Sequence, residues 1–267
     1  MTRFAVIALF SAAPAFAGVS LSMELTTDKS TITTTMSVEG EKARVEDGEG
    51  KMITLFDGAT RTLRVLMPRE KRYQEITAED LKRFKAMLDN AAPMMKAAME
   101  HMPPEQRKQM EAVMAKAPPP DKMAEAAKTP WKFEKTGKKT KIGEFDCEVY
   151  AGTKGDAKAD LCAASWSATK INKDDVKALA ALSNFLQEGF GQVQAQSQGG
   201  VESEFSQFPG LPVRMVTTKA DGSKTTSLLK SVKKGALDKA TFELPAGYEK
   251  MSGAAQMHMK GNVPMHE

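Results

Sequence analysis

Two segments of this sequence concentrate methionine and histidine, whose thioether and imidazole groups are suitable ligands for Cu(I). The first is MMKAAMEHMPPEQRKQMEAVM, residues 94–114, in which six of the 21 residues are methionine. The second is the C-terminal stretch 251–267. Copper binding in that stretch is one hypothesis. Its candidate ligands are Met257, His258, Met259 and His266.

The methionines of residues 94–114 also fit explanations that need no metal. Met95, Met99 and Met102 fall at i, i+4 and i+7, which places them in one stripe of a helix. Because methionine adapts to irregular neighbours, the stripe can be permanent core, a deformable lid over a hydrophobic ligand, or a surface for a partner helix. A lipid chain under such a lid would gain about 0.8 kcal/mol per buried methylene. The candidate lid residues are Met95, Met99, Met102, Met110 and Met114.

Cys147 and Cys162 are the only cysteines of the sequence. In an oxidising compartment an even pair is more often a disulfide than a catalytic or metal site. Both lie in strand-like segments, and a hairpin centred on Lys154 and Gly155 would place them directly opposite each other. The disulfide would close a loop of about 15 residues and contribute roughly 3 kcal/mol. Redox-active or copper-binding thiols are the alternative, but there is no Cys-x-x-Cys motif.

The sequence carries no recognisable catalytic motif. It has no Gly-x-Ser-x-Gly elbow and no phosphate-binding loop. Of its three histidines, His258 and His266 lie near the C-terminus and His101 lies in the Met-rich segment. We therefore expect a non-enzymatic protein without a cofactor.

The first 17 residues are typical of a secretory signal peptide. Arg3 supplies the positive charge, residues 4–13 form a short apolar stretch, and Ala15 and Ala17 form a small-x-small cleavage site. We expect cleavage after Ala17 and a periplasmic or secreted protein. No later segment reaches the length of about 20 apolar residues that a membrane-spanning helix needs.

The net charge is +4 for the full chain, and removing Arg3 with the signal peptide lowers it by one. This mild charge does not indicate a nucleic-acid partner. The basic stretch Lys132–Lys141 could make transient contact with an anionic membrane surface. A solvated edge strand that lysines protect from pairing is the simpler explanation.

Apolar and polar residues alternate along several segments, for example at residues 19–26 and 32–38. This period of two is typical of strands with one dry face. Asp57-Gly58 and Asp221-Gly222 are signals for two-residue hairpin turns. Helical patterns interrupt the strands at about residues 78–116 and 174–191.

These patterns predict an α+β protein, an antiparallel β half-barrel (a meander) covered by inserted Met-rich helices. We expect one domain over residues 18–250 and a disordered Met/His tail over residues 251–267. Two small domains split near residues 117–130 are the alternative. We prefer one sheet, since neither half alone has enough helix to cover its strands.

Several stretches resemble the exported bacterial family called domain of unknown function 4412. They are VEGEKARVE (38–46), MPPEQRKQMEAVM (102–114), IGEFDCEVYAG (142–152), QFPGLPVRMVT (207–217) and VKKGALDKATFELPAGYEKM (232–251). The resemblance covers most of the chain after the signal peptide, and Phe242–Tyr248 is its most specific piece. It implies an exported protein and a layout similar to periplasmic lipoprotein-localisation carriers, but no reaction.

Taken together, the sequence favours an exported protein that binds a hydrophobic or lipid-like molecule under a Met-rich helical lid. The first alternative is a periplasmic copper-binding or envelope-stress protein. The second is a structural or interaction module. A carrier requires an internal apolar cavity, which a filled core would not provide.

Overall fold

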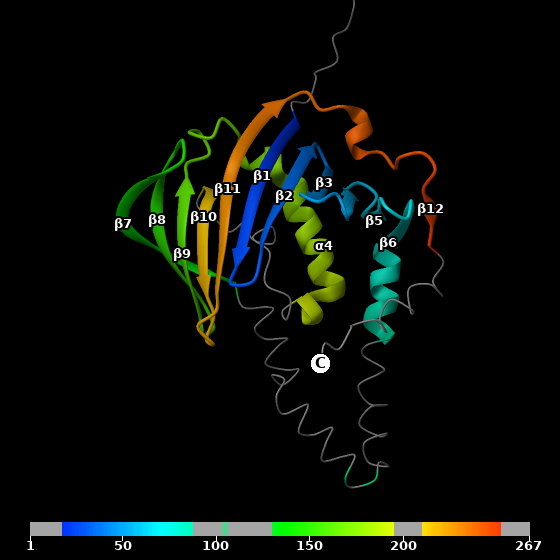
Figure 1. Cartoon of the computed structure of the whole chain (residues 1–267), viewed down its shortest axis with the longest axis horizontal. Helices are drawn as coiled ribbons and strands as arrows, with labels where there is room; N and C mark the ends of the chain where they lie inside the picture. The colour runs from blue at the N-terminus through cyan, green and yellow to red at the C-terminus, as the bar shows by residue number, and fades with distance from the viewer. Residues whose placement is uncertain (1–17, 88–102, 104, 106–129, 195–209, 252–267) are drawn as a thin grey trace, which may run out of the picture.

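The computed structural model describes residues 18–87, 103, 105, 130–194 and 210–251. These residues form a single sheet of twelve strands in the order β12-β6-β5-β4-β3-β2-β1-β11-β10-β9-β8-β7. Neighbouring strands are antiparallel except β12 and β6, which are parallel. The sheet is open, because β12 and β7 lie at its opposite edges (Figure 1).

The strands come in three groups along the chain. The first six are β1 (Gly18–Thr27), β2 (Thr31–Glu39), β3 (Lys42–Asp47), β4 (Ile53–Asp57), β5 (Thr62–Met67) and β6 (Arg72–Thr77). The next three are β7 (Lys132–Ile142), β8 (Phe145–Lys154) and β9 (Ala157–Ala164). The last three are β10 (Leu211–Thr218), β11 (Lys224–Gly235) and β12 (Glu249–Lys250).

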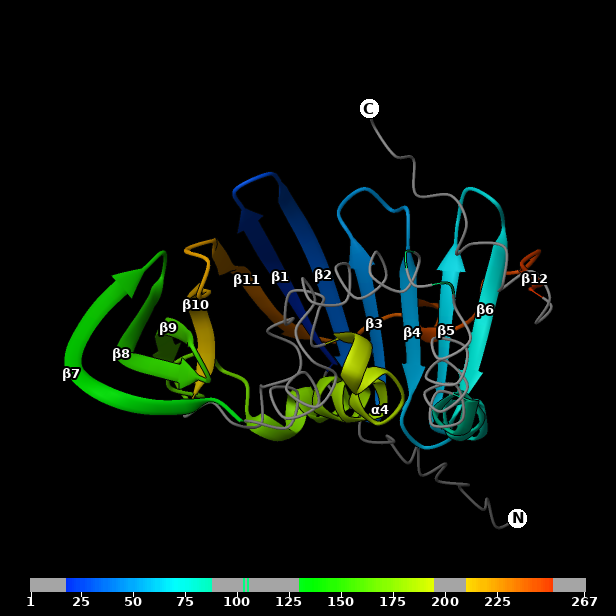
Figure 2. The same ribbon diagram turned by 90° about the horizontal axis from the view of Figure 1, so that it is seen from below.

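The longer described helices lie between these groups. Residues 78–87 form a helix after β6. The 3-10 helix η1 (Lys173–Val176) leads into α4 (Lys177–Gln194), and the 3-10 helix η3 (Lys239–Phe242) follows β11. Figure 2 shows α4 and helix 78–87 on the same side of the sheet. No described helix is long and apolar enough to cross a membrane.

The main core lies between the sheet and these two helices. In β1, Val19, Leu21 and Met23 are buried and point toward the helices, as the period of two requires. From α4, Phe185 is 1% exposed and its ring centroid lies 5.5 Å from that of Phe56 in β4. This packing fixes α4 over β2, β3 and β4.

A second apolar cluster lies on the opposite face of β4, β5 and β6. Ile53, Leu55 and Leu66 are buried there, on the alternate positions to those that face the core. The chain after β11, residues 236–251, crosses this face and is called the C-terminal strap here. Its Leu244 and Tyr248 pack on the cluster, and its end forms β12 beside β6.

The lysine-rich stretch Lys132–Lys141 lies in β7, at one edge of the sheet. A bulge interrupts its pairing with β8 between Lys135 and Lys139. Within the bulge, the Thr136 hydroxyl donates a hydrogen bond of 2.8 Å to the carbonyl of Val149. Exposed lysines and a bulge are two ways in which a sheet edge avoids pairing with other chains.

The structure corrects two details of the predicted hairpins. Residues 58–61 and 219–223 form the turns, which are therefore longer than the two residues predicted. The reason is side-chain hydrogen bonding. The carboxylates of Asp57 and Asp221 each accept a backbone N–H two residues further on, which builds the turn around the aspartate.

The predicted C-terminal tail begins one residue too early. Met251 is 6% exposed, and its N–H donates to the carbonyl of Tyr73 at 2.8 Å, so this residue belongs to the folded strap. Residues 252–267 lie outside the described part of the chain.

Candidate ligand-binding site

A row of side chains runs across six strands of the sheet. Residues directly opposite each other in a sheet share a face. The paired residues along the row, from β2 to β8, are Ile32, Leu25, Ser227, Met215, Leu161 and Tyr150. Leu25 shares the face of Leu21 and Met23, which contact the main core. At a strand spacing of about 4.8 Å the row is about 24 Å long.

The exposure of the row rises from β9 toward β2. Leu161 is fully buried and Met215 is 5% exposed, whereas Ile32 is 47% exposed. Leu25 is partly buried. Met215, Leu161 and Tyr150 belong to a buried apolar cluster that is separate from the main core under α4.

An aromatic pair packs on this cluster at the β7 end of the sheet. The rings of Trp131 and Phe133 stack with centroids 5.8 Å apart. Phe133 pairs with Gly152 of β8, where an added Cβ would lie 2.6 Å from its ring. Gly152 therefore makes room for the ring, and the aromatic pair covers this end of the sheet.

Tyr150, at the end of the row, is held by a charged pair. Its hydroxyl donates a hydrogen bond of 3.0 Å to Glu148 Oε2. Lys135 Nζ donates a second hydrogen bond, of 2.8 Å, to the same Glu148 oxygen. Burial raises the pKa of Tyr150, and hydrogen bonding to Glu148 raises it further. The hydrogen bond from Lys135 holds the pKa of Glu148 below its ordinary value.

Ser183 of α4 is a buried hydroxyl without a partner. It is 5% exposed, and its Oγ has no hydrogen bond within the described structure. Neighbouring residues along the helix, such as Leu179, Leu182 and Leu186, are apolar core residues. An unpaired buried polar atom is uncommon in folded proteins and needs an explanation, such as a water or a ligand.

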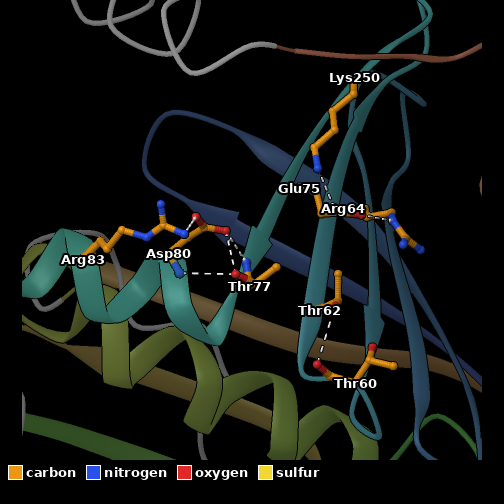
Figure 3. A network of polar contacts seen from close by, with 8 residues as sticks. All are labelled: Thr60, Thr62, Arg64, Glu75, Thr77, Asp80, Arg83 and Lys250. Carbon is orange, nitrogen blue, oxygen red and sulfur yellow. Dashed lines mark hydrogen bonds and ion pairs between the residues drawn. The ribbon is translucent and has the colours of Figure 1, made fainter.

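On the opposite face, Glu75 of β6 ties the strap to the sheet. It accepts hydrogen bonds from Lys250 Nζ at 2.6 Å and from Arg64 Nε at 2.8 Å (Figure 3). The hydrogen bond from Lys250 is the main reason that the pKa of Glu75 lies below its ordinary value, and the bond from Arg64 adds to it. The carboxylate thus joins β5, β6 and β12.

Helix 78–87 starts at a reciprocal cap that Figure 3 also shows. Thr77 donates its N–H and its hydroxyl to Asp80, while the Asp80 N–H donates to the Thr77 hydroxyl. These bonds lower the pKa of Asp80. The cap orients the helix so that Leu81, 4% exposed, reaches the main core.

Cys147 and Cys162 form a disulfide, with Cα atoms 5.5 Å apart. The predicted register was wrong by two residues, since Cys162 pairs with Val149 and not with Cys147. The hairpin turns at Gly155 and Asp156, and the two cysteines are diagonal neighbours on one face. Both are buried in the main core, which suits a structural disulfide.

The other predicted site residues lie outside the described part of the chain. This holds for the candidate lid residues Met95, Met99, Met102, Met110 and Met114, and for the candidate copper ligands Met257, His258, Met259 and His266. Within the described residues, no group of three or more His, Cys, Asp or Glu side chains could hold a metal ion. Both sets of candidates stay predictions.

The family described as Domain of unknown function (DUF4412) matches residues 94–248, which is more than half of the chain. The chain belongs to this family. This confirms the resemblance seen in the sequence. In this DUF4412 protein, the matched residues include β7 to β11, α4 and most of the strap. Among curated proteins, none matches the sequence.

Several solved structures are similar to this DUF4412 protein at low identity. An uncharacterized conserved protein from Thermus thermophilus has 8% identity and a TM-score of 0.43, with 88% of this chain and 89% of that one covered. MucB in the MucA/MucB complex of Pseudomonas aeruginosa has 8% identity and a TM-score of 0.37, covering 85% and 55%. A DUF1329 family protein from Desulfovibrio piger has 9% identity and a TM-score of 0.29, covering 86% and 90%. Such low scores establish no shared function.

Sequence patterns did not reveal the strap or the network around Glu75. One signal was present, since Leu55 and Phe56 are adjacent apolar residues and must point to opposite faces of β4. That pattern indicates a strand with two dry faces. It does not say which segment covers the second face.

Proposed function

We propose that this chain is an exported, non-enzymatic envelope protein that binds a hydrophobic or lipid-like molecule along the cross-strand row. The observation that carries the proposal is the cross-strand row from Ile32 to Tyr150, which joins the exposed Ile32 to the buried apolar cluster of Met215, Leu161 and Tyr150. A chain-like apolar ligand laid along this row would gain about 0.8 kcal/mol for each methylene buried against it.

The Met-rich residues 94–114 complete the proposal from the sequence side. Their methionines would form the deformable cover over the ligand, in an open half-barrel of antiparallel strands. The unpaired hydroxyl of Ser183 supports a ligand that also carries a polar group, because a hydrogen bond would remove the cost of its burial.

Export follows from the proposed cleavage after Ala17. Gly18, which would become the N-terminus, is already part of strand β1. N-terminal sequencing of the protein from its own envelope fraction tests this, with Gly18 as the expected first residue. Retention of residues 1–17 would contradict it.

Native mass spectrometry of the same preparation tests the binding function. A co-purifying lipid-like mass supports the proposal, and bare protein that also fails to bind the fluorescent apolar probe N-phenyl-1-naphthylamine contradicts it. Leu25→Gln should weaken probe binding, since Leu25 lies in the row and is partly exposed. The matched control is Met52→Gln, because Met52 is 51% exposed and lies outside the row.

A further inference from the structure

A cavity lies on the face of the sheet opposite α4, beside the C-terminal strap. Its volume is about 340 Å³. Strands β3, β4 and β5 form its floor, and residues 242–244 of the strap form its wall. Leu55 in the floor belongs to the apolar cluster on the strap side, which places the cavity away from the proposed hydrophobic site.

The floor is built from two cross-strand rows. Lys42, Asp57 and Thr62 are paired directly across β3, β4 and β5. Leu55 and Arg64 are paired in the adjacent row. The register therefore brings two cations and one carboxylate to the same small area, with an apolar side chain beside them.

The charged side chains of the floor still have hydrogen-bond donors and acceptors that a ligand could use. Arg64 uses Nε for its bond to Glu75, and Figure 3 shows the outer end of its guanidinium turned away from that carboxylate. Within the described residues, Lys42 makes no ion pair. Asp57 accepts its two turn hydrogen bonds through Oδ1 alone, which leaves Oδ2 for another donor.

The wall adds a carboxylate and two apolar side chains. Glu243 is exposed and lines the cavity between Phe242 and Leu244. The strap is fixed over the sheet on both sides of this point. On one side Arg44 donates to the carbonyl of Thr241 at 3.3 Å, and on the other Leu244 packs on the outer cluster. The cavity therefore has a defined shape.

We propose that this cavity binds a small zwitterion of the short-peptide type with an apolar side chain. Its carboxylate would lie at Arg64 and Lys42, where guanidinium and ammonium groups donate to an anion. Its ammonium would lie at Asp57 and Glu243, and its side chain would pack against Phe242. A simple anion fits less well, since the two carboxylates of the site would repel it. The volume is near the lower limit of small-molecule pockets, so the ligand is small.

The dipeptide alanyl-leucine is a suitable probe, with N-acetyl-alanyl-leucine and alanyl-leucinamide as forms that lack one charge each. Binding is measured by NMR shifts of the leucine methyl groups and the phenylalanine rings. We expect saturable shifts at Leu55, Leu244 and Phe242, with a Kd on the order of 1 mM for a ligand of about 14 non-hydrogen atoms. Each capped form should bind about fivefold more weakly.

Two variants assign the charges to the two ends of the ligand. Lys42→Gln should weaken binding of alanyl-leucine about fivefold and remove most of the difference between it and its amide. Glu243→Gln should do the same for the N-acetyl form. Both residues are exposed, so neither change should unfold the protein. Lys51→Gln, outside the cavity, is the matched control and should have no effect.

Several results would overturn the proposal. One is the absence of saturable NMR shifts at alanyl-leucine concentrations up to about 20 mM, which is 20-fold above the expected Kd. The others are equal binding of all three probes, and shifts at residues outside the cavity. The result does not depend on the proposed hydrophobic site along the cross-strand row, because the experiment uses neither its residues nor its ligand.

Discussion

Replacing Phe185 by alanine is the most direct test of how α4 is held on the sheet. The side chain is 1% exposed and its ring packs against Phe56 of β4, with centroids 5.5 Å apart. Truncating a buried phenylalanine to alanine costs about 3–5 kcal/mol, from lost burial and from the cavity that remains. The aromatic pair itself accounts for about 0.5–1.5 kcal/mol of this loss.

The assay is reversible unfolding of the protein without residues 1–17, followed by circular dichroism in urea and on heating. For a chain of this size, each kcal/mol lowers Tm by about 2–4 °C, so Phe185→Ala should lower it by roughly 6–20 °C. Phe185→Leu should lie between the wild type and the alanine variant, since it fills part of the cavity.

Gln187→Ala is the matched control in the same helix, because Gln187 is exposed. It should change the free energy of unfolding by less than about 0.5 kcal/mol. A cost below about 1 kcal/mol for Phe185→Ala would refute the reasoning, because truncating a buried phenylalanine should cost several times more. It would mean that α4 does not pack on the sheet in solution.

Three further predictions concern the strap, the disulfide and a close backbone contact. Because hydrogen bonds hold the pKa of Glu75 below its ordinary value of 4.5, its contribution to stability is fully present above pH 4.5. That contribution is lost as pH falls through the lowered pKa, and Glu75→Gln should flatten this part of the stability profile. Replacing Cys147 and Cys162 together by serine should cost roughly 3 kcal/mol, because the disulfide closes a loop of 15 residues. Gly210→Ala should cost about 1–3 kcal/mol, since its Cβ would collide with a backbone carbonyl at the end of β9.

Each of the three has an outcome that contradicts it. For Glu75, an equal loss of stability between pH 5 and pH 3 in wild type and variant would do so. For the cysteines, the contradicting outcome is that a reducing agent leaves the unfolding midpoint of the wild type unchanged. Gly235→Ala is the control for Gly210→Ala, since an added Cβ at Gly235 meets nothing within 4 Å. Equal stability of these two variants would contradict the close contact.

The sequence predicted strands such as β1 well because they have one apolar, buried face and one polar, more exposed face. In β1 the buried positions Val19, Leu21 and Met23 follow the period of two that defines a strand. The start of helix 78–87 was also predictable, since Thr77 and Asp80 have the spacing of a cap. Both signals are local, and neither depends on which distant segment the element contacts.

Long-range features were not predictable from such patterns. The partner of β1 on one side is β11, about 200 residues away along the chain, and no local pattern specifies it. The disulfide pairing was predictable only because there are two cysteines, and the register was still wrong by two residues. The strap cavity depends on the crossing of residues 242–244 over Lys42 and Arg64, which only the three-dimensional structure reveals.

The strap also determines when the second apolar cluster can be buried during synthesis of the chain. Leu55 and Leu66 lie in β4 and β5, whereas Leu244 and Tyr248, which pack on them, are made much later in the chain. A growing chain therefore exposes this apolar cluster until residues 244–248 have been made. During that interval the nascent chain would depend on a chaperone or on rapid release, since such exposed clusters promote aggregation.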